Sequence, residues 1–289
     1  MSQPEVPREE SARRISASSA RPPAIPHILR TVLAIAGVDT GGGAGIAADL
    51  CTIAAYRHHG APVITSVTAQ NSLGIQAIYD LPGEFVARQI ESVVSDLEVH
   101  AVKVGMLGRA RTVEQVASMI ESHSMPNVVV DPILRSTTGT PLLEKAGIAI
   151  LREKLLPRAF LVTPNMDEAA ILAGHRVDDL QSMKDAAARI HALGPRNVVV
   201  TGGHLQGRAI DVLYDGERHA IFDFTRIVST STHGVGCTFA TAVACQLARG
   251  ESVAEAIEDA KRFVLRAVVA ATPRIGKGAG PLNHLVSPF

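Results

Sequence analysis

The sequence predicts a single α/β domain in which helices cover both faces of a mostly parallel β-sheet. Short runs rich in β-branched residues alternate with longer stretches whose apolar residues recur every three or four positions, as in α-helices. The short runs are apolar throughout, as in Val128-Val129-Val130, which is expected of strands buried from both sides. No linker is evident after residue 30, so we expect one domain over residues 31–289.

Each element is predicted from its local pattern. The predicted strands are Thr31–Gly37, Pro62–Thr68, Val99–Gly105, Asn127–Asp131, Phe160–Thr163 and Asn197–Thr201. The predicted helices are Ile46–His58, Glu84–Leu97, Val113–His123, Met183–Leu193, Thr238–Arg249 and Val253–Ala270. A late hairpin is expected over Asp211–Phe224, with Asp215-Gly216 at its turn. In open α/β sheets ligands bind at the carboxyl ends of the strands, so functional residues are expected there.

Composition narrows the class of ligand. Lys and Arg number 28 and Asp and Glu also number 28, so no charge excess indicates a nucleic acid or an anionic membrane as partner. The three cysteines have no C-x-x-C spacing, which favours neither a disulfide framework nor a zinc site. No apolar run approaches the roughly 20 residues that span a bilayer. We expect a cytoplasmic protein that binds a small molecule.

Residues 1–30 differ from the rest of the chain. They are rich in Ser, Arg, Pro and Glu and lack the apolar core of a secretory signal. This composition predicts a disordered N-terminal tail. An organelle-targeting peptide is the alternative, favoured by arginines and serines, whereas the early acids Glu5, Glu9 and Glu10 argue against it.

A glycine-rich turn follows the first predicted strand, over residues 41–45. Such a turn before a helix suits close approach of a ligand. Residues 43–48 match the dinucleotide fingerprint G-x-G-x-x-A, but no acid follows at the end of the next strand to hold a ribose. Neither this turn nor Gly276-Lys277-Gly278 has the Gly-Lys-Ser/Thr of a P-loop. A purely structural turn remains an alternative.

A second glycine-rich turn precedes an apolar helix near the other end of the chain. Gly234 and Gly236 allow backbone N–H groups to converge on one point, and the helix dipole adds positive charge, so an anion is expected there. Cys237 lies at the same helix start, where we expect a lowered thiol pKa and the role of base or nucleophile. The alternative is a buried structural cysteine, which is also our interpretation of Cys51 and Cys245.

Several short motifs, taken in order, carry a family resemblance between about residues 31 and 285. They are Ala36-Gly37, Gly41-Gly42-Gly43-Ala44-Gly45-Ile46, Ala48-Asp49-Leu50, Val67-Thr68-Ala69-Gln70-Asn71, Gly105-Met106-Leu107, Val130-Asp131-Pro132, Thr163-Pro164-Asn165, Glu168-Ala169, Gly202-Gly203-His204, His233-Gly234, Gly236-Cys237-Thr238, Gly276-Lys277-Gly278 and Gly280-Pro281. In this order they resemble the hydroxymethylpyrimidine/phosphomethylpyrimidine kinases of the ribokinase superfamily. The resemblance implies a ribokinase-like fold and a homodimer.

The resemblance also implies a reaction in thiamine biosynthesis. ATP would phosphorylate 4-amino-5-hydroxymethyl-2-methylpyrimidine, and then its monophosphate, with Mg²⁺ as cofactor. Asp49 would lie near the hydroxyl, Gln70 would read the ring nitrogen and amino group, and Met106 and Gly37 would line the ring. Gln offers both a donor and an acceptor, which suits an aminopyrimidine edge. Taken singly, a capping Asp, a loop Gln and a core Met are equally reasonable interpretations.

For ATP, the resemblance implies a site at the second glycine-rich turn. Gly234 and Gly236 would form the catalytic anion hole, and Cys237 would be the base that takes the proton of the hydroxymethyl group. Glu168 would hold Mg²⁺ through water. The remaining implied ATP-binding residues are Asp131, Asn165, Thr201, Gly203, Val235 and Lys277.

The chain departs from the family pattern at four positions. Ala47, Cys51, Thr201 and Val235 stand where the family usually has Gln, Lys, Lys and Thr. The loss of two cations puts the turnover rate and the second phosphorylation in question. The lost lysines leave a weakly active pyrimidine-binding protein open as an alternative. A pyridoxine or pyridoxal kinase also stays open, because that substrate too is a hydroxymethylated nitrogen heterocycle.

Overall fold

The computed structural model describes residues 29–136, 139–203, 208–272 and 275–288. The strands are β1 (Thr31–Val38), β2 (His59–Asn71), β3 (Gly74–Asp80), β4 (Ala101–Val104), β5 (Val128–Val130), β6 (Leu161–Val162), β7 (Val198–Gly202), β8 (Ala209–Tyr214) and β9 (His219–Phe224). The helices are α1 (Gly45–Ala55), α2 (Gly83–Val94), α3 (Ala110–Ser122), α4 (Lys145–Ile150), α5 (Met166–Ala173), α6 (Leu180–His191), α7 (Val235–Arg249) and α8 (Val253–Val269). A π-helical turn (Leu151–Leu155) and a 3-10 turn (Leu156–Arg158) follow α4.

Within the described residues the strands form one sheet, in the order β3-β2-β1-β4-β5-β6-β7-β8-β9. Neighbours from β2 to β7 run parallel, whereas β3, β8 and β9 are joined antiparallel at the two edges. The predicted α/β class with a mostly parallel sheet is therefore confirmed. The late hairpin is also confirmed, and Gly216 in its turn has a φ of 98°.

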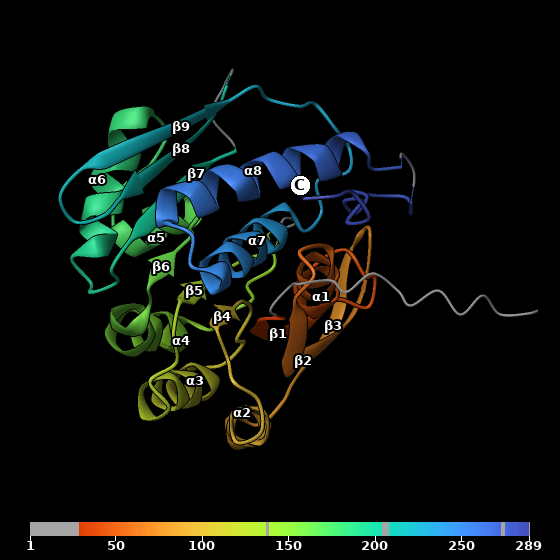
Figure 1. Cartoon of the computed structure of the whole chain (residues 1–289), viewed down its shortest axis with the longest axis vertical. Coiled ribbons are helices and arrows are strands. Elements are labelled where there is room, and N and C mark those ends of the chain that lie inside the picture. The colour runs from red at the N-terminus through yellow and green to blue at the C-terminus, as the bar shows by residue number, and fades with distance from the viewer. Residues whose placement is uncertain (1–28, 137–138, 204–207, 273–274, 289) are drawn as a thin grey trace, which may run out of the picture.

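Alternate residues of the central strands pack on opposite faces. Val102 and Val104 face the core that is shared with α2, α3, α5 and α6, while Ala101 faces the core shared with α1, α7 and α8. Figure 1 shows α7 and α8 lying side by side on one face of the sheet, with α1 beside β1 and β2. Both faces are covered, which explains why the strand sequences are apolar at nearly every position.

Some elements differ from the sequence-based expectation. The second strand continues beyond the predicted Pro62–Thr68 to Asn71, and it returns as β3 through a tight turn at Ser72 and Leu73. Neither β3 nor α5 was predicted. The tail predicted for residues 1–30 falls almost wholly on residues 1–28, which lie outside the described part of the chain.

Candidate active site

The two glycine-rich turns meet above the carboxyl end of β1. Gly234, the residue that precedes α7, has a φ of 87°, and a Cβ on it would lie 1.9 Å from the Gly43 carbonyl oxygen. A Cβ on Gly43 would in turn lie 2.5 Å from Cδ2 of His233. These approaches are too close for any side chain, so glycine is required at both positions. The contact joins the first turn to the start of α7.

The backbone donors of the first turn are taken by a carboxylate of the chain itself. Asp39 Oδ1 accepts a hydrogen bond from Gly41 N at 2.7 Å, and Oδ2 accepts from Ala44 N at 2.9 Å and Gly43 N at 3.2 Å. These bonds and His233 lower the pKa of Asp39 even though burial, the largest single influence, raises it. In this turn the N–H groups of Gly41, Gly43 and Ala44 therefore donate to Asp39, whereas in a phosphate-binding loop such groups donate to the ligand.

At the second turn, no side chain accepts from the backbone N–H groups that begin α7. The Val235 N–H donates to Thr232 O over a long distance of 3.4 Å. The positive end of the helix dipole lies at the same place. Asp131 approaches it from the end of β5, since a Cβ on Gly236 would lie 3.9 Å from Asp131 Oδ2. This geometry suits the anion hole that the sequence predicted at Gly234 and Gly236.

Cys237 lies in the first turn of α7 and is buried. Burial raises the pKa of its thiol to about 12, although the Lys103 ammonium acts in the opposite direction, and the charges of Asp131 and Asp49 raise it further. The prediction of a lowered thiol pKa is therefore wrong for the protein without ligands. The helix dipole and Lys103 do not offset the loss of solvation.

Two buried carboxyl groups lie near the second turn. Burial raises the pKa of Asp131 to about 6, against the effect of Lys103. Burial and the charge of Asp131 raise the pKa of Glu168 to about 8. Asp131 Oδ2 has no hydrogen-bond partner within the described residues. Repulsion between buried carboxylates and an unpartnered oxygen are features of a site that a cation completes.

Asn165 and Glu168 also cap α5. Asn165 Oδ1 accepts from Glu168 N at 2.9 Å, and Glu168 Oε2 accepts from Asn165 N at 3.0 Å, which together form a capping box. Thr201, in β7, donates its backbone N–H to Pro164 O at 2.9 Å and so lies beside Asn165. The structure thus brings Asn165, Glu168 and Thr201 together at adjacent strand ends.

Gly203 and Lys277 belong to two different surroundings. Gly203 follows β7, and its carbonyl oxygen accepts a hydrogen bond from Arg226 Nη1 at 2.7 Å. Lys277 is exposed, and its backbone N–H donates to Ser72 Oγ at 3.0 Å. Lys277 is therefore placed against the turn between β2 and β3.

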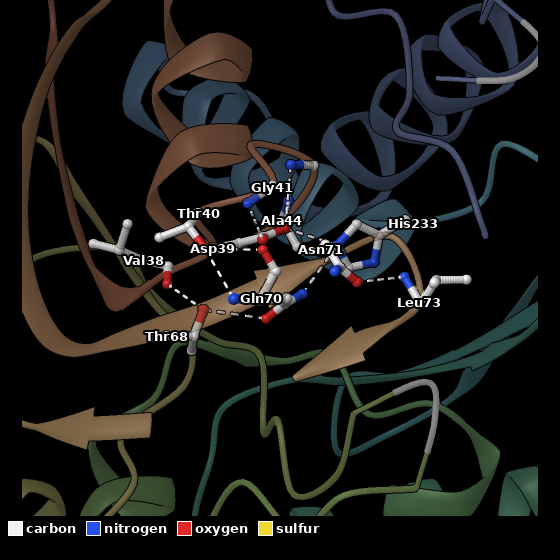
Figure 2. A network of polar contacts seen from close by, with 11 residues as sticks. Val38, Asp39, Thr40, Gly41, Ala44, Thr68, Gln70, Asn71, Leu73 and His233 are labelled. Carbon is white, nitrogen blue, oxygen red and sulfur yellow. Dashed lines mark hydrogen bonds and ion pairs between the residues drawn. The ribbon is translucent and has the colours of Figure 1, made fainter. Parts of the chain in front are cut away.

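On the other side of the first turn lie the residues that were predicted to hold a ring. A Cβ on Gly37 would lie 3.1 Å from Met106 Sδ, so the two residues are in contact. Gln70, near the end of β2, is half-buried, and its amide lies between Thr68 and His233 (Figure 2). The structure therefore brings Gly37 and Met106 together, and it places Gln70 against the second glycine-rich turn through His233.

Asp49 is an exception among the predicted substrate contacts. It is fully buried in α1, and both of its carboxylate oxygens accept from Lys103 Nζ, at 2.8 and 2.9 Å. Thr241 Oγ1 donates to the same carboxylate at 2.7 Å. These partners enclose Asp49 in the protein without ligands, so its carboxylate is not free for a ligand there, and its place near the substrate hydroxyl stays a prediction. The ion pair instead lies beneath Cys237.

Sequence reasoning missed Asp39, His233 and Lys103. A local signal existed for Asp39, because an Asp two residues before a glycine is typical of a side chain that bonds the backbone two residues on. Nothing local marks Lys103, which occupies one position of an otherwise apolar strand, Ala-Val-Lys-Val. Its role depends on Asp49, 54 residues earlier.

No helix among the described residues is both long enough and apolar enough to cross a bilayer.

The phosphomethylpyrimidine kinase family model matches residues 39–283. The hydroxymethylpyrimidine/phosphomethylpyrimidine kinase of Streptomyces coelicolor is 47% identical over 263 residues, which cover 91% of this chain and 96% of that protein. The thiamine biosynthesis bifunctional protein ThiED of Geobacter sulfurreducens is 45% identical over 89% of this chain, which spans about half, 52%, of that longer protein.

A solved structure is also similar. The ADP complex of Bacillus subtilis pyridoxal kinase superposes with a TM-score of 0.82 at 36% identity, and the match covers 89% of this chain and 97% of that one. The similarity thus extends over most of the chain.

Proposed function

The chain belongs to the phosphomethylpyrimidine kinase family and is a phosphotransferase, and from this premise we propose how its site works. The substrates are ATP and 4-amino-5-hydroxymethyl-2-methylpyrimidine, followed by the monophosphate of that alcohol, in thiamine biosynthesis. The observation that carries the proposal is the contact between the turns at Gly43 and Gly234. It sets a ring-binding side with Gly37, Met106 and Gln70 against an anion-binding side at the start of α7.

Transfer requires the alcohol oxygen and the γ-phosphorus to be held in line while charge on the phosphoryl oxygens is neutralised. The N–H groups at the start of α7 supply fixed positive dipoles for this purpose, since no side chain caps them. As the new O–P bond forms, the bond from phosphorus to the leaving ADP oxygen breaks. The hydroxyl proton passes to the sulfur of Cys237, which acts as the thiolate.

Cys237 must lose its own proton before it can act as the base. Burial favours the protonated thiol in the free protein, so the positive charge of Mg²⁺ that enters with ATP would have to lower the pKa. The thiolate would take the hydroxyl proton as the alcohol oxygen bonds to phosphorus and becomes more acidic. Lys103 already favours the thiolate, and it is fully buried, so its charge is little screened by solvent.

Mg²⁺ fits the buried acids. Asp131 and Glu168 would hold it, Glu168 through water, while Thr201, Gly203 and Lys277 would contact ATP. Magnesium in kinases is bound by one or two carboxylates together with water and substrate phosphates. Among the described residues no cluster of three or more His, Cys, Asp and Glu side chains forms a metal cage, which agrees with this mode. The metal supplies charge neutralisation for the phosphates.

An ADP-release assay tests the function. We expect Mg²⁺-dependent ADP release with the pyrimidine alcohol and with its monophosphate, and slower release with pyridoxal. Pyridoxal is the second candidate substrate, because of the structural likeness to a pyridoxal kinase. Faster turnover of pyridoxal at equal concentrations would reverse the assignment. Binding of the pyrimidine without ADP release would instead indicate a binding protein.

We also propose that the protein forms a homodimer through the β3 edge of the sheet. Tyr79 and Leu73, on β3 and the turn before it, are 69% and 60% exposed, and among the described strands β3 pairs with β2 alone. An exposed apolar edge of this kind pairs readily with a second chain. Light scattering should give twice the chain mass of 30.5 kDa, and Tyr79→Lys should shift it toward the monomer. A monomer for the unaltered chain contradicts the proposal.

A further inference from the structure

The carboxylate of Asp39 links two segments that are far apart in sequence. Its hydrogen bonds with the backbone of the first glycine-rich turn use both of its oxygens. Oδ2 also lies 2.7 Å from Nε2 of His233, 194 positions later (Figure 2). An ionised carboxylate only accepts hydrogen bonds, so Nε2 of His233 must carry the proton of this contact.

His233 spans the junction of the two turns. Its imidazole packs on Gly43, its backbone N–H donates to Gly280 O at 3.1 Å, and the next residue is the left-handed Gly234 that starts α7. The imidazole therefore contacts the first turn at the place where α7 begins. Only 18% of this side chain is exposed, so its position is set by the protein rather than by solvent.

The same imidazole determines how Gln70 can orient its amide. The Thr68 hydroxyl, which lies 3.3 Å from Oε1 of Gln70, gives its one proton to Val38 O at 2.9 Å. His233 Nε2 gives its proton chiefly to Asp39, and Nε2 of Gln70 lies 3.3 Å from it. The Thr68 oxygen can therefore only accept from Gln70, and the protonated Nε2 of His233 cannot accept a hydrogen bond from it. A half-turn of the amide, which exchanges its oxygen and nitrogen, satisfies both neighbours.

In that orientation one lone pair on the amide oxygen and one N–H remain along the outer edge of Gln70. The two together match a heterocycle that has an amino group beside a ring nitrogen. The amino group donates to the oxygen and the ring nitrogen accepts from the N–H. Pyridoxal has no amino group beside its ring nitrogen, so it cannot make both contacts.

We propose that Asp39 and His233 are positioning residues that lock the two glycine-rich turns together and orient the Gln70 amide for an aminopyrimidine. The inference rests on the proposed function, because it takes the pyrimidine as the ligand of Gln70. It adds two residues that hold the substrate-reading group without touching the substrate. Selection of the pyrimidine over pyridoxal then depends on the hydrogen bond between His233 and Asp39, two residues that do not contact the ligand.

Calorimetric titration of the full chain tests this without turnover. The pyrimidine alcohol and, separately, ADP with Mg²⁺ are titrated into the unaltered protein and into His233→Ala, His233→Gln and Asp39→Asn. We expect His233→Ala and Asp39→Asn to weaken pyrimidine binding about 10- to 100-fold, as for one or two lost hydrogen bonds to a buried partner. ADP binding should change by less than about 3-fold, because the N–H groups of α7 remain. His233→Gln should restore most of the affinity, since its amide N–H can reach Asp39.

The controls separate this role from general damage to the fold. His59→Ala removes an exposed histidine at the start of β2 and should change neither titration. The double variant Asp39→Asn/His233→Ala should be no weaker than the worse single variant, because both break the same contact. Unchanged pyrimidine binding in His233→Ala, equal losses for both ligands, or no rescue by His233→Gln would overturn the inference while leaving the kinase assignment intact. An unaltered protein that does not bind the pyrimidine would overturn both.

Discussion

Cys237→Ala is expected to lower turnover about 100- to 10,000-fold, the span typical of a lost general base. Binding of the pyrimidine and of ATP should stay within a few-fold, because the backbone of the α7 start and Cβ remain. The decisive measurement is single-turnover phosphorylation at saturating concentrations of both substrates, with binding followed separately by calorimetry. Cys237→Ser should not recover activity, because a hydroxyl is a much weaker acid than a thiol and would not form the anion even with the substrates bound.

A matched control for this prediction lies on the same helix. Cys245 is also a fully buried cysteine of α7, but it is far from the turn, so Cys245→Ala should cost stability and leave the phosphorylation step unchanged. An alkylating agent should label the exposed Cys51 first, without inactivation, since Cys237 is buried and protonated. If Cys237→Ala keeps more than a tenth of normal turnover, the residue only packs the site, and another group takes the proton.

Lys103→Met is expected to have the largest effect on stability. The Lys103 and Asp49 side chains are both fully buried. Burial is the largest single influence on the pKa of Lys103 and lowers it. The nearby anions, led by Asp49, together outweigh burial, so the pKa of Lys103 is raised. Removing the ammonium leaves a buried carboxylate whose only other partner in the described structure is Thr241. Loss of one member of such a pair typically costs about 3–5 kcal/mol. Urea unfolding should show this as a lower midpoint at an unchanged slope.

Two controls make the result specific. Lys154→Met breaks an exposed ion pair with Glu114, and such pairs contribute only about 0.2–1 kcal/mol. The double variant Asp49→Leu/Lys103→Met removes both charges and should recover most of the loss, because an apolar pair of similar volume is often as stable as a buried ion pair. A cost below about 1 kcal/mol for Lys103→Met would show that water or a shifted proton compensates.

The strands buried in the centre of the sheet could be predicted because both of their faces pack against helices. Burial on two faces demands apolar residues at nearly every position, as in β5 (Val128–Val130) and β7 (Val198–Gly202). The edge strand β3 (Gly74–Asp80) escaped prediction because it is largely exposed and carries no such run. For α5 a signal was present, since Asn165 and Glu168 have capping-box spacing, but we interpreted them only as ATP-site residues.

The site could be predicted where function depends on local backbone. Glycines before a helix are visible in sequence, and so is a cysteine at the helix start. The surroundings of Cys237 could not be predicted, because they come from β4, β5 and α1, and it is these surroundings that raise the thiol pKa. The ion pair of Asp49 with Lys103 could not be predicted either, because the two residues are distant in sequence. Without that partner in view, Asp49 was interpreted as a substrate contact.

The contact between the turns at Gly43 and Gly234 also sets when activity can appear during synthesis. Asp39 and His233 are separated by 194 positions, which a ribosome adding 5–20 residues per second covers in about 10–40 s. A nascent chain that ends before α7 has every strand of the sheet but neither the anion-binding turn nor Cys237. In such a chain Asp49 also lacks the hydrogen bond that it accepts from Thr241. Catalysis therefore begins only after α7 has left the ribosome.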